Sequence, residues 1–178
     1  MCFSHPASFI LMCAATRKRQ AARVVCLDEQ DRILLIEAHD PANPAKPDWW
    51  EIPGGGLDWN EPTVDCARRE LYEEAGIVEA DMGPVIWTQS VQFMFAGMHF
   101  DQDEYIHVAR CKGGEIKPQA LEMFEAMAFK SARWWPLQEL LEADVYTLPH
   151  RLKEFLPPIV RGELPPEPLD ITEPNPPW

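Results

Sequence analysis

The chain has 178 residues, which is enough for one domain with a hydrophobic core and extensions at its ends. Its formal net charge is −13, so polyphosphate backbones and anionic membranes repel it; this argues against a general nucleic-acid-binding or membrane-binding function. The cysteines show neither a zinc-binding spacing nor a disulfide framework, which predicts a reducing, cytoplasmic location. They are Cys2, Cys13, Cys26, Cys66 and Cys111.

Residues 1–19 are interpreted as a flexible N-terminal extension. The apolar run at residues 8–15 is followed, rather than preceded, by the basic residues 17–19, which is the reverse of the order in a secretory signal. The run is also too short to span a bilayer. An early start codon with Met12 as the natural start is one explanation, and a packed or dimer-swapped arm is the other. We expect the domain itself over residues 20–161.

The domain begins with predicted strands. Residues 21–27 and 32–38 are rich in apolar and β-branched side chains, and the polar residues 28–31 between them form a turn, so the sequence predicts a hairpin. A short strand at residues 49–53 then leads to three glycines at 54–56.

A helix follows the glycines. We expect it to start at Glu61 and Pro62, because proline suits the first helical position. Gly76 lies where a left-handed C-terminal cap is expected. At about 100° per residue, the apolar side chains of this helix form one stripe that can pack on a sheet. They are Val64, Ala67, Leu71 and Ala75.

Acidic residues occupy a neighbouring face of the same helix. Glu70, Glu73 and Glu74 are spaced at i, i+3 and i+4, so their side chains lie close together. Three adjacent carboxylates repel one another, and a hard cation such as Mg²⁺ with oxygen ligands would compensate. Arg69 is the nearest positive charge and is expected to orient one of the acids. The alternative is a solvated, glutamate-rich surface.

The segments after the helix alternate between strand-like and helix-like sequence. Strands are expected at residues 84–95, 99–111 and 132–135, and helices at 120–127 (or an ordered loop), 136–143 and 149–160. We expect the last helix to stop at Pro157 and Pro158. Residues 162–178 are rich in proline and acids and are interpreted as an extended or disordered tail. This order of elements fits an α/β fold, a mixed sheet covered by helices on both faces.

The stretch from Gly55 to Ile77 resembles the Nudix box, a glycine, five residues, a glutamate, seven residues, then Arg-Glu-apolar-any-Glu-Glu-any-Gly-apolar. The matching positions are Gly55, Glu61, Arg69, Glu70, Leu71, Glu73, Glu74, Gly76 and Ile77. The chain is therefore similar to the Nudix hydrolase family, directly over the box and by layout over about residues 20–145. The resemblance implies an α/β/α sandwich with a mixed β-sheet, in which the box is a loop–helix–loop.

The family resemblance also implies metal-dependent hydrolysis of a pyrophosphate linkage in a nucleoside diphosphate derivative or a nucleoside triphosphate. By motif position, Glu70, Glu73 and Glu74 are the ligands of Mg²⁺, with Mn²⁺ as the second option. The backbone at Gly54 is expected to add a carbonyl oxygen, because glycine allows close approach. Acids are needed because the bound metal must neutralise an already negative substrate and activate a water.

The remaining catalytic and substrate-binding residues are less determined by the sequence. Some family members use a box glutamate as general base, and others use a glutamate from a distant loop. Glu122 and Glu125 lie where that loop is expected, with Glu104 as a third candidate. Arg23 on the first strand is a candidate for contacting a phosphate. Trp50 is a candidate for stacking on a base, although core packing is the alternative for its aromatic ring.

Other functions are weighed against the hydrolase. A Nudix-fold sensor that binds a nucleotide metabolite without turnover would be expected to lose box glutamates, and this chain keeps all of them. A prenyl diphosphate isomerase would need a catalytic cysteine, which neither Cys66 nor Cys111 supplies convincingly. RNA decapping would need a basic surface. The expected partner is a small nucleotide substrate, and the resemblance is compatible with a homodimer.

Overall fold

The computed structural model describes residues 16–174. Its strands are β1 (Arg17–Leu27), β2 (Ile33–Ala38), β3 (Trp49–Glu51), β4 (Gly54–Gly56), β5 (Ala80–Phe95), β6 (Met98–Cys111), β7 (Phe129–Trp135), β8 (Tyr146–Leu148) and β9 (Leu169–Asp170). Its helices are α1 (Thr63–Ala75), α2 (Met123–Ala128), α3 (Leu137–Glu142) and α4 (Leu152–Val160). Among residues 16–174, no helix is long and apolar enough to cross a membrane.

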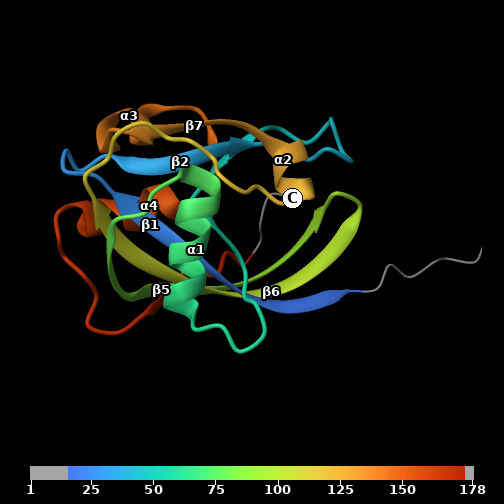
Figure 1. Ribbon diagram of the computed structural model, residues 1–178, viewed down its shortest axis with the longest axis horizontal. Helices are drawn as coiled ribbons and strands as arrows, with labels where there is room; N and C mark the ends of the chain where they lie inside the picture. Colours follow the sequence, from blue (N-terminus) through green and yellow to red (C-terminus); the bar gives the residue numbers. More distant parts are fainter. Residues whose placement is uncertain (1–15, 175–178) are drawn as a thin grey trace, which may run out of the picture.

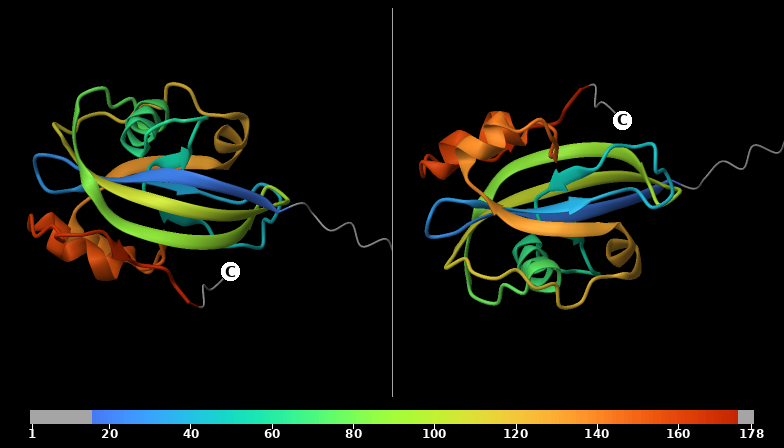
Figure 2. Two further views of the ribbon diagram at one scale, coloured as in Figure 1. Left: turned by 90° about the horizontal axis from the view of Figure 1, so that it is seen from below. Right: turned by 90° about the horizontal axis from the view of Figure 1, so that it is seen from above.

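The strands form a mixed sheet in the order β8-β3-β2-β1-β6-β5-β9, with β4 beside β1 and β7 beside β2. β1 and β6 run parallel along the whole of β1, and β5 pairs antiparallel with β6. Helices cover both faces: α1 and α2 lie on one face, and α3 and α4 on the other (Figures 1 and 2). This arrangement confirms the predicted α/β/α architecture with a mixed β-sheet.

The predicted hairpin of β1 and β2 forms only at its turn. Asp28 is buried and accepts hydrogen bonds from the backbone N–H groups of Gln30 and Arg32, both at 2.9 Å. Beyond the pair Leu27–Ile33 the two strands separate. A strand has only two edges, and those of β1 are taken by β6 and β4, while those of β2 are taken by β3 and β7. The hairpin prediction was therefore wrong for most of its length.

Alternation along β1 supplies both layers of the core. Val24 and Cys26 pack with the apolar stripe of α1, whereas Val25 and Leu27 pack with residues of α3 and α4. Successive side chains of a strand point to opposite faces of a sheet, so one buried strand contributes to both layers. β1 therefore contributes side chains to the core on both faces of the sheet.

The last helix, α4, continues past its two prolines, contrary to the expected stop. Pro157 and Pro158 lie inside α4, which ends at Val160. Each proline lacks the N–H that would bond to the preceding turn. Leu152, Leu156 and Ile159 are nevertheless buried in the core. This apolar packing stabilises the helix although two of its backbone hydrogen bonds are missing.

The acidic C-terminal segment differs from the expected detached tail. β9 pairs parallel with β5, and the N–H of Ile171 donates to the carbonyl of Thr88 at 2.8 Å. Ile171 is fully buried in the core that contains Trp87. One large apolar side chain in an otherwise polar segment is enough to dock it, because burying that side chain contributes about 1.5–3 kcal/mol. Residues 175–178 of the expected tail lie outside the described residues.

The expected N-terminal extension lies mostly outside the described residues. Its end is not detached, however, because β1 begins at Arg17 and pairs with β6 from the register pair Arg17–Phe100 onward. The sequence placed the start of the strand at residue 21, because residues 17–20 are polar. Pairing along the edge of β6 extends the strand through them.

Candidate metal centre and active site

Helix α1 carries the box residues and is held against the sheet by its apolar side. Cys66, Ala67, Leu71 and Ala75 are fully buried and pack with residues of β1, β2 and β6. Pro62 is the N-cap residue, and Gly76 adopts a left-handed conformation with φ 73° at the C-terminus. A side chain at Gly76 would also approach the carbonyl oxygen of Lys117 to 2.5 Å. The predicted limits of this helix are confirmed within one or two residues.

Three carboxylates meet beside α1. Glu70 and Glu74 of α1 and Glu125 of α2 each offer an oxygen, and these oxygens lie within 4.8 Å of one another. Glu70 is 3% exposed and Glu74 is 8% exposed. We refer to Glu70, Glu74 and Glu125 as the acidic cluster. Glu73, the third box glutamate expected to bind metal, is not a member; its carboxylate accepts a hydrogen bond from Arg69 at 3.0 Å.

The glycine loop closes one side of the acidic cluster. A Cβ on Gly55 would stand 2.4 Å from Oε1 of Glu70, so only glycine leaves room for that carboxylate. The N–H of Gly54 donates to Oε2 of Glu74 at 2.9 Å. Gly54 was expected to offer its carbonyl to a metal; in this structure that carbonyl accepts a hydrogen bond from Arg23 at 3.3 Å.

Arg69 holds several acids in place. Its guanidinium donates to both oxygens of Glu61 at 3.0 Å, to Glu70 at 2.7 Å and to Glu73 at 3.0 Å. It also donates to the carbonyl of Gly56 at 3.1 Å, which ties the glycine loop to the helix. The structure therefore pairs Glu61, the first glutamate of the box, with Arg69. These contacts fit the expected orienting role.

The acidic cluster is only partly balanced by positive charge, because Arg69 pairs with Glu70 at 2.7 Å while three carboxylates converge. Burial raises the pKa of Glu70 to about 7, and the charge of Arg69 opposes this rise only in part. Burial, followed by the charges of Glu70 and Glu51, raises the pKa of Glu74 well above its usual value. Burial also raises the pKa of Glu125. Three converging carboxylates with a single arginine beside them are the donor set that Mg²⁺ or Mn²⁺ prefers, so these residues fit such an ion.

The structure separates the two candidates from the distant loop. Glu125 points into the acidic cluster, whereas Glu122 is exposed and lies at the N-cap of α2. Their side chains form a capping box, in which the N–H of Glu122 donates to the carboxylate of Glu125 at 2.7 Å. An acid at the N-cap position and a second acid three residues later, inside the short helix, are the signal in the sequence for this capping box.

Backbone hydrogen bonds bring α2 to the cluster. The N–H of Lys117 donates to the carbonyl of Ala75 at 2.9 Å, and the N–H of Gln119 donates to the carbonyl of Glu73 at 2.8 Å. The segment before α2 is therefore bound to the C-terminal end of α1, where helix carbonyls lack intrahelical partners. Local sequence patterns do not reveal this docking.

The other candidates lie outside the acidic cluster. Arg23 and Glu104 form an ion pair at 2.8 Å, with side chains 12% and 2% exposed. Trp50 packs against the core on the side of α3 and contacts Trp135 edge to face, with ring centroids 5.0 Å apart. Glu51, which the sequence analysis did not single out, approaches Arg23 at 3.5 Å, and its charge contributes to the raised pKa of Glu74.

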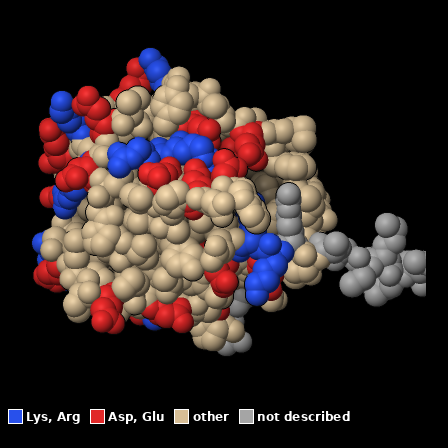
Figure 3. Space-filling model, turned by 60° about the horizontal axis from the view of Figure 1, so that its bottom comes forward, with Lys and Arg blue, Asp and Glu red and all other residues tan. Residues whose placement is uncertain are grey.

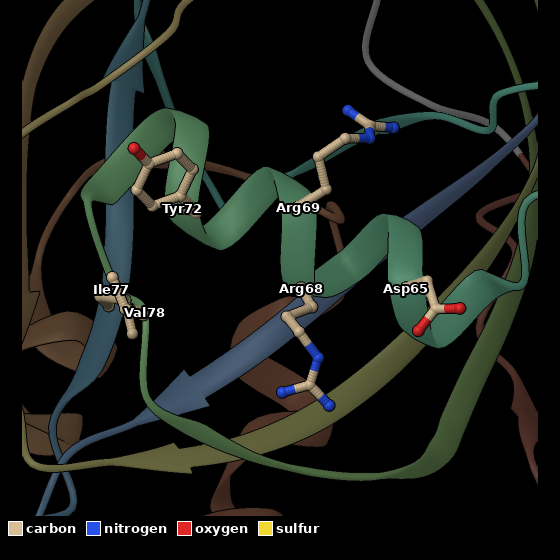
Figure 4. Close-up of a pocket in the computed structure, with 6 residues that line it drawn as sticks. All are labelled: Asp65, Arg68, Arg69, Tyr72, Ile77 and Val78. Atoms are coloured by element: carbon tan, nitrogen blue, oxygen red, sulfur yellow. The ribbon is translucent and has the colours of Figure 1, made fainter.

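Two surface hollows lie near the site, and neither is lined by a member of the acidic cluster. A groove of about 320 Å³ follows the outer side of α1, where Arg68 and Arg69 point to opposite sides of the helix (Figure 4). Its lining residues are Asp65, Arg68, Arg69, Tyr72, Ile77 and Val78. A second hollow of about 200 Å³ lies on β5 and β6 and includes Gln89 and Glu104. Basic side chains on the face in Figure 3 are mixed with acidic ones and form no continuous basic surface there.

Comparisons with known proteins agree with this fold. A family profile for the NUDIX domain matches residues 17–158. The CMP-5'-(N-acetyl-N-hydroxy-3-aminopropyl)phosphonate hydrolase of Streptomyces rubellomurinus is 30% identical over 123 residues, which cover 68% of this chain and 53% of that protein. The RNA pyrophosphohydrolase of Bartonella henselae is 64% identical over 28 residues, 16% of each chain. The chain thus spans about half of the first relative and less of the second.

Solved structures share the architecture at low sequence identity. An ADP-ribose pyrophosphatase from Streptococcus suis matches with a TM-score of 0.56 and 19% identity over 87% of this chain and 98% of that one. An Ap4A hydrolase from C. elegans matches with a TM-score of 0.55 and 17% identity over 81% and 98%. These structures support the fold alone. Since the family profile covers most of the chain and includes the whole box, the chain belongs to the Nudix hydrolase family.

Proposed function

We propose that this protein is a divalent-metal-dependent hydrolase that cleaves a pyrophosphate linkage in a nucleoside diphosphate derivative or a nucleoside triphosphate. The observation that carries the proposal is the acidic cluster, in which two buried carboxylates and a half-buried one offer oxygens within 4.8 Å of one another. Such a cluster is costly to keep charged unless a cation compensates it. Relatives of the chain include a protein named as an RNA pyrophosphohydrolase.

Glu70, Glu74 and Glu125 would hold the ion, Mg²⁺ or Mn²⁺. A bound divalent cation supplies positive charge against the phosphate oxygens and acidifies a water for attack on phosphorus. Arg69 orients Glu70, and Gly54 orients Glu74, so both ligands are fixed before substrate arrives. We assign Glu73 to the rim of the site, because it shares the Nη1 group of Arg69 with Glu70.

The proposed partner is a small nucleotide rather than a nucleic acid, because the chain has a net charge of −13 and a substrate phosphate must be attracted locally. We also propose a reducing, cytoplasmic location, on the basis of five cysteines without a disulfide pattern. A sensor without turnover is the weaker proposal, since all four box glutamates are present and two of them, Glu70 and Glu74, enter the acidic cluster.

A product assay tests the proposal. The purified protein is incubated with a panel of nucleoside diphosphate derivatives and nucleoside triphosphates, with Mg²⁺, with Mn²⁺ and with EDTA. We expect cleavage of one substrate class with either metal and none with EDTA. Glu74→Gln should remove this activity, while Glu154→Gln, a change in an exposed ion pair on α4, should keep it. Tight nucleotide binding without products from any substrate would contradict the hydrolase and favour the sensor.

A further inference from the structure

A buried ion pair connects two strands of the sheet to the glycine loop. Arg23 of β1 donates through Nε to Oε1 of Glu104 on β6 at 2.8 Å, and the two side chains are 12% and 2% exposed. Removing two charges from water costs several kcal/mol per ion before their attraction is counted, so a buried pair is weak evidence for stability by itself. The other contacts of Arg23 and Glu104 indicate the role of this pair.

Glu104 is held in one orientation by amides. Gln89 donates from Nε2 to Oε2 of Glu104, and Gln102 donates from Nε2 to Oε1. Burial acts to raise the pKa of Glu104, but the charge of Arg23 and these hydrogen bonds outweigh it and lower that pKa. Glu104 is therefore a fixed negative charge, and it sets the position of the Arg23 guanidinium.

The other end of Arg23 contacts the backbone that precedes α1. Its Nη1 donates to the carbonyls of Ile52 at 3.2 Å and Gly54 at 3.3 Å. The N–H of Gly54 in turn donates to Oε2 of Glu74 at 2.9 Å. Gly54 has φ 147°, a region that favours glycine, and a Cβ there would meet the backbone of Arg23 at 2.5 Å. The order of contacts runs from Glu104 through Arg23 and Gly54 to Glu74.

We propose that Arg23 and Glu104 are positioning residues that hold the backbone of residues 52–54 so that the N–H of Gly54 orients the Glu74 carboxylate for the divalent cation. This inference rests on the proposed metal site. It replaces the expected phosphate contact of Arg23, because the guanidinium is already engaged by Glu104, by Glu51 and by two carbonyls. Neither Arg23 nor Glu104 is part of the acidic cluster.

The first test measures Mn²⁺ binding without substrate, by calorimetry, in the full chain. Arg23→Lys keeps the positive charge but removes the planar guanidinium group, which contacts Glu104 and Gly54 at the same time. Glu104→Gln keeps the shape of the side chain but removes its negative charge, which weakens the contact with Arg23. We expect each variant to bind Mn²⁺ about 10–100-fold more weakly, as changes behind metal ligands do. The double variant should bind Mn²⁺ about as tightly as the single variant with the lower affinity, because both substitutions act through Gly54. Arg161→Lys, in an exposed ion pair, is the control and should bind as the wild type does.

The second test separates this inference from the proposed function. Amide hydrogen exchange of Gly54, followed by NMR in the metal-free protein, should become faster in Arg23→Lys and Glu104→Gln, while buried amides of β1 stay protected. If wild-type protein bound no Mn²⁺ but Gly54 still lost protection, the metal site would be refuted and the positioning would stand. Unchanged Gly54 exchange in a folded variant would overturn the positioning. So would a raised KM with unchanged Mn²⁺ affinity, which a direct phosphate contact predicts.

Discussion

At the scale of single residues, close approach decides which side chains the site tolerates. Glu70 and Gly55 are fifteen residues apart in sequence, yet the carboxylate of Glu70 lies where a side chain of residue 55 would be, 2.4 Å from the ideal Cβ. The glycine is needed for space, because its φ is not among the positive values in this structure. The glycine at the start of the box thus has a physical reason in this chain.

Gly55→Ala should therefore damage the site without unfolding the protein. The added methyl group must displace the Glu70 carboxylate, and a displacement of about 1 Å can lower turnover by about 100-fold. The measurement is kcat together with the Mn²⁺ dissociation constant, with circular dichroism to show that the fold persists. Gly56→Ala should have a smaller effect, since its methyl group meets only the end of the Arg19 side chain, at 3.1 Å. Equal kcat in Gly55→Ala and wild type would contradict the steric argument.

At the scale of elements, α2 is the part of the site that the box does not contain. The segment before it binds the C-terminal end of α1 through the carbonyls of Glu73 and Ala75, and this docking turns Glu125 inward. The capping box leaves Glu122 outside, with its side chain on the backbone of its own helix. The family resemblance and the place of this segment before β7 indicated only that Glu122 or Glu125 was a candidate general base.

The two acids of α2 should consequently respond differently to substitution. Glu125→Gln should reduce turnover by about 100-fold or more, because it removes a charged oxygen donor from the cluster. Glu122→Gln should change turnover only slightly, since a weaker cap costs about 1 kcal/mol of local helix stability at most. Steady-state kinetics with saturating Mg²⁺ distinguish the two. A larger loss of turnover in Glu122→Gln than in Glu125→Gln would contradict this assignment and favour Glu122 as the catalytic residue of this segment.

At the scale of the whole molecule, segments far apart in sequence complete the core. Ile171 is fully buried, and β9 covers the outer edge of β5 (Figure 2). An edge strand left open would expose unpaired backbone groups. The acidic, proline-rich composition of residues 162–178 hides this role, because one isoleucine supplies most of the apolar contact.

Ile171→Ala should lower the free energy of unfolding by about 2–5 kcal/mol, the usual cost of truncating a buried isoleucine. Denaturation with urea, followed by fluorescence, measures the change. Leu164→Ala, at a side chain that is 43% exposed, is the matched control and should shift stability by less than about 0.5 kcal/mol. If Ile171→Ala were as stable as the wild type, residues 162–178 would not contribute to the stability of the domain, as a detached tail would not.

The site was partly predictable from the sequence. The face shared by Glu70 and Glu74, the orienting Arg69 and the cap at Gly76 follow from spacing along one helix, and the structure places them accordingly. Trp50 and Glu122 show the limit of such reasoning: the first packs on Trp135, and the second caps α2. The assignment of metal ligands itself stays a prediction until binding is measured.

The sequence by itself determined the box helix, because its period, its proline start and its glycine end are local properties of the chain. It also determined the fold class, through the order of strand-like and helix-like segments. Only the tertiary structure decided that β1 pairs with β6 rather than with most of β2, that Glu125 completes the cluster, and that Arg23 holds Gly54. These depend on contacts between residues dozens of positions apart, and no local period encodes which distant segments fill the same space.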